Sequence, residues 1–82
     1  MLRTPIIGKY YRVSKGLPSM LGGTLIVKHD LVRIDSVSFT RGVIVCTRAR
    51  GRFQFRCGLT LGHIFKFVNQ KKAEMDWALE AL

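Results

Sequence analysis

Acidic side chains are scarce in this sequence. Its 82 residues include five Asp and Glu against fourteen Lys and Arg, which gives a formal net charge of +9. Before residue 74 the only acids are Asp30 and Asp35, and an odd spacing along a strand places two side chains on opposite faces. This spacing does not support a site of paired carboxylates. The chain also has no nucleophile elbow and no phosphate-binding loop. We therefore expect a binding protein that is not an enzyme and needs no cofactor.

Cysteines are few, and long apolar runs are missing. Cys46 and Cys57 are the only two cysteines, and two cysteines alone cannot hold zinc. His29 and His63 have no metal-ligand spacing to them, so we expect no metal site. We expect no signal peptide and therefore reduced thiols in a cytoplasmic protein. No run approaches the roughly 20 apolar residues that a membrane span needs.

Basic residues, in contrast, are abundant and unevenly placed. All fourteen precede residue 74, whereas the last nine residues contain three of the five acids. A compact domain with this excess of charge repels itself, and an anionic partner would relieve the repulsion. Nucleic acid is the commonest such partner, and an acidic protein surface is the alternative. A chain this short buries a modest core, so oligomerisation would add to its stability.

Short β-forming runs separated by turn residues make up most of the chain. They occupy residues 9–13, 24–28, 31–39, 43–47, 53–57 and 63–68. A loop rich in Gly and Pro covers 14–23, and a shorter loop is expected at 58–62. In 31–39 both alternating sets contain apolar residues, so the inward face stays ambiguous. The pattern predicts a mainly β domain over 1–69, built as a small antiparallel barrel of about five strands.

The C-terminal segment, 70–82, is predicted to be a helix. It lacks Gly and Pro, is rich in Ala, Glu, Leu and Met, and follows Asn69, a residue suited to capping a helix. Trp77 lies off the apolar stripe expected to dock the helix. The helix is either packed on the barrel or appended to it. The residues of the predicted docking stripe are Met75, Ala78, Leu79 and Leu82.

The clearest element is the hairpin over 43–57. A two-residue loop at Gly51-Arg52 suits a type II′ turn, because Gly supplies the positive φ, and it places Cys46 opposite Cys57. A loop at Arg50-Gly51 shifts the pairing by one residue on each strand. In both registers one apolar face is shared, and we predict that it forms the core. Its residues are Ile44, Cys46, Phe53, Phe55 and Cys57.

Three stretches resemble the SH3-like small barrels, including the KOW and Tudor-type modules. They are the run Lys9-Tyr10-Tyr11-Arg12-Val13, the loop ending Gly22-Gly23-Thr24, and the hairpin from Gly42 to Cys57, within residues 9–68. A KOW motif places a single Gly in a tighter pattern, which the Gly pair matches loosely. In size and charge the chain is also similar to accessory proteins of bacteriophages. Many of those bind nucleic acid or disable a host protein.

Arginines concentrate in the same hairpin, with no acid between them. Because a guanidinium binds phosphate through two parallel hydrogen bonds and stacks on bases, we predict a nucleic-acid-binding surface here. Tyr10 and Tyr11 point to opposite sides of a strand, so one is core and the other is either a stacking platform or a half-buried ring. The predicted binding residues are Arg41, Arg48, Arg50, Arg52, Arg56, Tyr10, Lys9 and Arg12.

Three alternatives stay open at this point. Neither a helix-turn-helix nor an RNA-recognition motif is present, so the sequence favours neither DNA nor RNA. The basic face could instead bind an acidic protein, for example as a phage-encoded inhibitor of a host enzyme, with the helix as a second interface. The arginines could also form a solvated face that protects an edge strand from aggregation.

Overall fold

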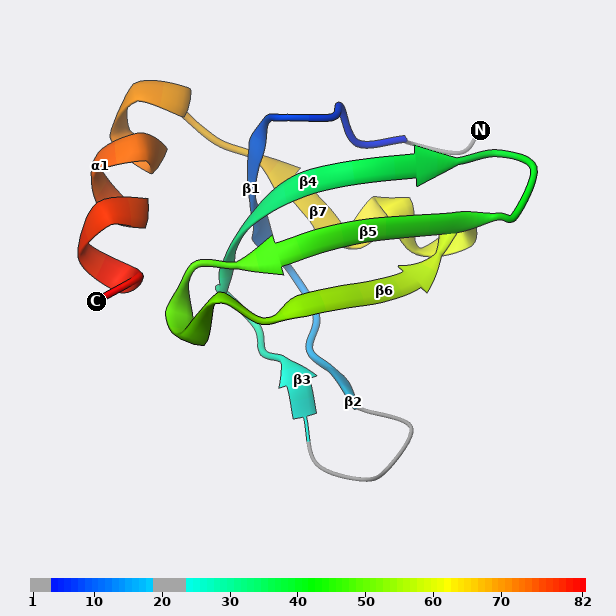
Figure 1. Ribbon diagram of the computed structural model, residues 1–82, viewed down its shortest axis with the longest axis horizontal. Coiled ribbons are helices and arrows are strands. Elements are labelled where there is room, and N and C mark those ends of the chain that lie inside the picture. The colour runs from blue at the N-terminus through cyan, green and yellow to red at the C-terminus, as the bar shows by residue number, and fades with distance from the viewer. Residues whose placement is uncertain (1–3, 19–23) are drawn as a thin grey trace.

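A computed structural model describes residues 4–18 and 24–82 as a mainly β fold (Figure 1). A five-stranded antiparallel sheet has the order β6-β5-β4-β1-β7, and β2 and β3 form a separate two-stranded ribbon. A 3₁₀ turn, η1, a 3₁₀ helix, η2, and an α-helix, α1, complete the fold. The elements are β1 (Tyr10–Val13), β2 (Leu17–Pro18), β3 (Thr24–Ile26), β4 (Leu31–Ser38), β5 (Val43–Arg48), η1 (Arg50–Arg52), β6 (Gln54–Gly58), η2 (Leu59–Ile64), β7 (Phe65–Phe67) and α1 (Gln70–Glu80).

The sheet is open, with β6 and β7 as its two edges, so the described residues do not form a closed barrel. Sequence pattern alone predicted a loop at 58–62, but Gly58 ends β6 and residues 59–62 belong to η2, which connects the two edge strands. Ile64 of η2 is fully buried, and Leu59 and Leu61 pack against the same core. The segment thus covers part of the inner face with side chains.

A bulge in β4 explains why the sequence left the inward face of this strand ambiguous. Ile34 pairs with Cys46 and Ser36 pairs with Val45, which leaves Asp35 as an extra residue between them. An extra residue reverses the alternation of side chains beyond it. Val32 and Ile34 therefore point inward before the bulge, and Val37 packs against the same core after it. Both of the alternating sets recognised in the sequence contribute to one face.

The main core lies on the inner face of the sheet. Four of the five hairpin residues predicted to point inward are buried there, which confirms those predictions. The exception is Phe53, which is 60% exposed. That prediction was wrong because β6 begins only at Gln54, and the ring of Phe53 lies over Gly51 instead. Tyr11, and not Tyr10, is the core tyrosine of the first strand. The buried residues of this cluster are Tyr11, Val13, Ile26, Val32, Ile34, Ile44, Cys46, Phe55, Cys57, Ile64 and Phe65.

The hairpin has the register of the Arg50-Gly51 alternative. Cys46 pairs with Phe55 and Ile44 pairs with Cys57, so the other alternative, a type II′ turn at Gly51-Arg52 with Cys46 opposite Cys57, is not the one adopted. The loop is longer, because Ala49 is fully buried and its N–H donates to the carbonyl of Leu31 at 2.9 Å. This contact draws the chain back toward β4 before it turns. Gly51 has φ 77°, the positive value expected there.

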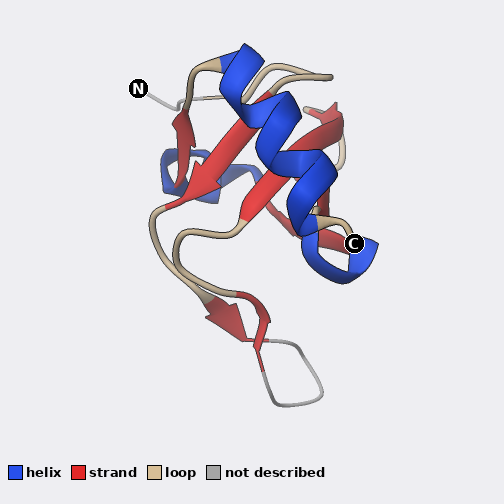
Figure 2. Cartoon of the chain, turned by 90° about the vertical axis from the view of Figure 1, so that its left-hand side faces the viewer, coloured by secondary structure: helices blue, strands red, loops and turns tan. Residues whose placement is uncertain are grey.

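Helix α1 begins where predicted but docks through a different face. The side chain of Asn69 accepts a hydrogen bond from the N–H of Lys72 at 3.0 Å, which caps the first turn. Ala73 is buried and Trp77 packs beside it, in a second cluster with Leu31 and Ala49. The helix lies across one side of the strands (Figure 2). This cluster lies on the opposite face of the sheet from the main core.

The predicted docking stripe faces away from the sheet. Met75 and Leu79 are each 69% exposed, and Ala78 and Leu82 are exposed as well. The docking face predicted from apolar spacing was wrong. The small side chain of Ala73 lets the helix approach the sheet closely, and the ring of Trp77 fills the space beside it. The ring of Trp77 lies 5.5 Å from that of Tyr10, between centroids.

Candidate nucleic-acid interface

Most of the few acids are held in ion pairs inside the fold. Asp35 lies 3.6 Å from Arg33 and also accepts a hydrogen bond from the hydroxyl of Thr47 at 2.6 Å. Ion pairs also hold Asp30, Asp76 and Glu80. These contacts neutralise some of the basic side chains and leave the others exposed.

Arg12 joins the sheet to the helix. Its guanidinium lies 3.1 Å from Asp76 and 2.9 Å from Glu80, one helical turn apart on α1. The hydrogen bond to Glu80 raises the pKa of Arg12, and the hydrogen bond from Lys72 lowers the pKa of Asp76. Arg12, predicted as a nucleic-acid ligand, thus lies within an intramolecular ion-pair network.

Arg48 is similarly engaged by an acid. Its Nε lies 3.1 Å from Asp30, and the two side chains are 14% and 9% exposed. The same carboxylate accepts a hydrogen bond from the N–H of Val27 at 2.8 Å and so holds the turn in which His29 has a positive φ of 75°. Arg48 therefore points into the fold between the hairpin and this turn.

Four of the predicted arginines remain exposed and have no acid within ion-pair distance in the part of the chain that the structure describes. Arg56 lies in the middle of β6, opposite Val45 of β5. The η1 turn and the β4–β5 turn lie at opposite ends of the sheet (Figure 1). At about 3.4 Å per residue, β5 alone separates them by about 17 Å. We call this set the arginine strip: Arg41, Arg50, Arg52 and Arg56.

The predicted residues of β1 lie apart from the arginine strip. In the sheet order, β4 separates β1 from β5. Tyr10 is half-buried against Trp77, and Gln70 bonds both its N–H and its carbonyl, at 2.8 and 3.0 Å. Lys9 is exposed beside it. The structure thus separates a basic hairpin from a helix junction that contains Tyr10 and Arg12.

A pocket opens on the outer face of the sheet, between members of the arginine strip. Its volume is about 180 Å³. None of its lining side chains is acidic. Sequence reasoning missed its two serines, because their position beside the arginines depends on the bulge at Asp35. The lining residues are Ser36, Ser38, Arg41, Val43, Val45 and Arg56.

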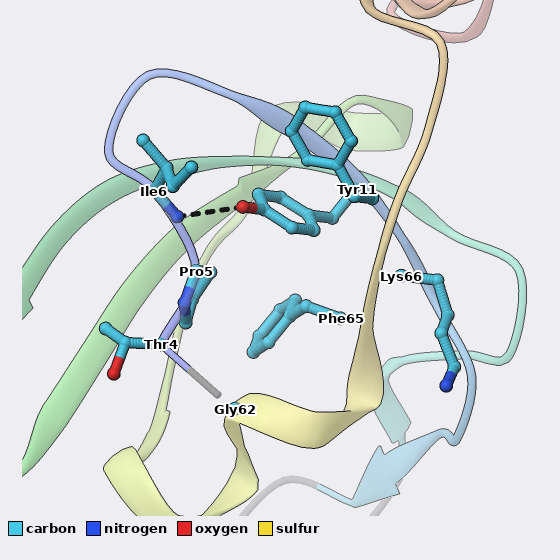
Figure 3. Close-up of a pocket in the computed structure, with 8 residues that line it drawn as sticks. Thr4, Pro5, Ile6, Tyr11, Gly62, Phe65 and Lys66 are labelled. Atoms are coloured by element: carbon cyan, nitrogen blue, oxygen red, sulfur yellow. Dashed lines mark hydrogen bonds between the residues drawn. The ribbon is translucent and has the colours of Figure 1, made fainter. Parts of the chain in front are cut away.

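A second pocket, of about 280 Å³, lies between the N-terminal segment and β7 (Figure 3). The rings of Tyr11, Phe65 and Phe67 line it, and the hydroxyl of Tyr11 accepts a hydrogen bond from the N–H of Ile6 at 2.8 Å. Lys66 is its one basic lining residue. This pocket is mainly apolar and lies at the other edge of the sheet from β6.

Both thiols are buried, and burial favours their protonated form. Burial raises the pKa of Cys46 to about 12 and that of Cys57 to about 11, so both stay protonated near neutral pH. Among the described residues, no three His, Cys, Asp or Glu side chains lie close enough together to hold a metal ion.

No known protein family, curated protein or solved structure matches this chain. Within residues 4–18 and 24–82, no helix is long and apolar enough to cross a membrane.

Proposed function

We propose that this protein binds nucleic acid through the arginine strip. The observation that supports this most is the distribution of ion pairs. Every described acid except Glu74 forms an ion pair, and the basic partners are Arg12, Arg33, Arg48 and Lys72. The arginine strip, in contrast, has no acid within ion-pair distance among the described residues. A guanidinium suits this task because its planar fork matches a phosphate with two hydrogen bonds.

The length of the arginine strip suits a nucleic-acid backbone. A span of about 17 Å corresponds to about five phosphates of each strand along the axis of a DNA duplex, at one charge per strand per about 3.4 Å. Strand β6, which contains Arg56, is a sheet edge, so a backbone can lie along it without meeting another strand of this chain's described part. Each phosphate that an arginine neutralises releases condensed cations, which drives binding and makes it dependent on salt.

We also propose that the fold is an open relative of the SH3-like small barrels. Five antiparallel strands and the early Gly/Pro segment support this relationship. A small β scaffold of this kind presents an exposed hairpin and a sheet face, which is what the proposed function needs.

A direct binding measurement tests the function. Purified protein is titrated at low salt against labelled duplex DNA, single-stranded DNA and RNA, and binding is read as fluorescence anisotropy. A non-specific contact by a few arginines gives a dissociation constant in the range of about 10⁻⁴ to 10⁻⁶ M at physiological salt. Binding to none of the three nucleic acids, even at low salt, would refute the proposal.

An acidic protein surface is the second candidate partner. The same arginine strip favours it by charge, and the exposed side chains of Met75 and Leu79 on α1 add an apolar surface. Polyglutamate of matched charge separates the two candidates. Competition by polyglutamate as strong as that by unlabelled nucleic acid supports the acidic protein, and weak competition supports nucleic acid.

A further inference from the structure

The outer-face pocket combines two kinds of surface. Val45 lies at its centre, paired with Ser36 on one side and with Arg56 on the other. A hydroxyl and a guanidinium therefore flank an apolar side chain. On the adjacent turn, the N–H of Arg41 donates to the hydroxyl of Ser38 at 3.1 Å, which holds the Arg41 backbone beside the pocket.

This combination fits a nucleotide better than it fits a bare anion. Val43 and Val45 offer an apolar surface for a base or a sugar, while Arg41 and Arg56 offer forked donors for a phosphate. A volume of about 180 Å³ equals that of roughly six water molecules, which is on the scale of one flat ring or one phosphate group. The serine hydroxyls add hydrogen-bonding groups at the same place.

An exposed aromatic ring lies in the turn that bears Arg41. Phe39 follows β4 directly and is 71% exposed. Exposed aromatic side chains serve as platforms on which the unpaired bases of single strands stack. A second ring, that of Phe53, is exposed next to Arg52 at the other end of the hairpin. Each end of the arginine strip thus has one exposed aromatic ring close to an exposed arginine in the sequence.

We propose that the outer-face pocket receives one nucleotide of a single-stranded nucleic acid. The base or sugar occupies the pocket against Val43 and Val45, and the phosphate lies at the rim of the pocket between Arg41 and Arg56. A duplex cannot place a base in this pocket, because its bases are stacked and paired and present only their edges in the grooves. The inference depends on the proposed function and adds a preference for single strands over duplexes.

The test fills the pocket without changing any charge. In Ser36→Leu, a larger apolar side chain occupies the pocket from an exposed position of β4. The matched control is Gln54→Leu, which adds the same side chain at an exposed position of β6 that does not line the pocket. Both variants are titrated against a labelled twelve-nucleotide single strand, as DNA and as RNA, and against the corresponding DNA duplex.

We expect Ser36→Leu to weaken single-strand binding at least fivefold, with duplex binding and the salt dependence unchanged. Gln54→Leu should stay within twofold of the wild-type protein on every probe. Two results overturn the inference while the proposed function stands: a wild-type protein that binds the duplex as tightly as the single strand, or two variants that bind the single strand equally. Failure of the wild-type protein to bind any probe overturns both proposals.

A second measurement does not depend on how well the Ser36→Leu variant folds. The wild-type protein labelled with nitrogen-15 is titrated with a single-stranded trinucleotide, and its amide resonances are followed. The largest shifts are expected at Ser36, Ser38, Arg41, Val45 and Arg56. Shifts concentrated in the helix or around the pocket of Tyr11 and Phe67 would contradict the assignment.

Discussion

Arg48 and Arg50 lie two positions apart in the sequence, yet their surroundings differ. Arg48 is nearly buried against Asp30, whereas Arg50 is exposed in the hairpin turn. In the sequence both are arginines of the same basic hairpin and cannot be told apart. The difference arises because Ala49, between them, is buried in the second cluster. The chain turns at this point, so that Arg48 lies against the fold and Arg50 lies in solvent.

This contrast predicts unequal effects on stability. Arg48→Ala leaves the carboxylate of Asp30 buried without its counter-charge, so the free energy of unfolding should fall by roughly 3 kcal/mol. Arg50→Ala removes an exposed side chain, and its effect should stay within about 0.5 kcal/mol. Urea denaturation measures both. Equal losses in the two variants would mean that the Arg48–Asp30 pair contributes nothing to the folded state.

The two thiols predict a dependence of stability on alkaline pH. Their pKa values in the folded protein, about 12 for Cys46 and about 11 for Cys57, lie above the ordinary value of 9.0, because burial disfavours the thiolate. Above pH 9 the unfolded chain loses these protons while the folded protein keeps them. The contribution of the thiols to the free energy of unfolding is therefore complete below pH 9. It falls as pH rises toward 11, by up to about 1.4 kcal/mol per pH unit for each thiol.

The matched control is the double variant Cys46→Ala/Cys57→Ala, which retains every other titrating group. Its free energy of unfolding should fall less steeply than that of the wild-type protein between pH 9 and pH 11. The comparison uses urea denaturation at a series of pH values under reducing conditions. Parallel curves for the two proteins would show that the thiols do not titrate differently on unfolding.

Among the elements, α1 shows how a helix can dock on a face that its apolar spacing does not mark. Ala73 and Trp77 contact the sheet, and Arg12 bridges from β1 to the acids of the same helix. Arg33 also lies over the Trp77 ring, with its guanidinium carbon 5.0 Å from the centroid. A ring, a small residue and an ion-pair network together fix the orientation of the helix.

Trp77→Ala should therefore destabilise the protein by about 2–3 kcal/mol, less than the loss of a fully buried aromatic ring. Leu79→Ala serves as the control, because Leu79 is exposed and its loss should change stability by no more than about 0.5 kcal/mol. Thermal denaturation followed by circular dichroism compares the two. A larger effect at Leu79 than at Trp77 would restore the docking face predicted from sequence spacing.

The elements also show what sequence can predict. Local chemistry placed the main strands, the Asn69 cap and the inward residues Ile44, Cys46, Phe55 and Cys57, because each depends on neighbours in the chain. The bulge at Asp35, the exposure of Phe53 and the docking face of α1 depend on contacts between distant segments. No local pattern contains that information. The serines of the outer-face pocket were missed for the same reason.

For the whole molecule, the central feature is how a large excess of base is distributed. The sequence predicted a basic hairpin, but it could not separate arginines held by acids from arginines left exposed. Ion pairs engage Arg12 and Arg48 and leave the arginine strip along β5 and β6. Of the eight predicted binding residues, four arginines of the hairpin and its adjoining turn face solvent without an acidic neighbour in the described chain, and Lys9, which is also exposed, lies apart from them beyond β4.

The salt dependence of binding tests this central claim most directly. One variant replaces all four residues of the arginine strip with Gln, and its control replaces four exposed lysines, Lys15, Lys28, Lys66 and Lys71, with Gln. Both lose the same net charge. If the strip contacts phosphates, the slope of log affinity against log salt for single-stranded nucleic acid should drop by about 3 in the arginine variant. The slope should change by less than about 1 in the lysine control. Equal slopes for the two variants would contradict the account, because binding would then follow net charge and not the arginine strip.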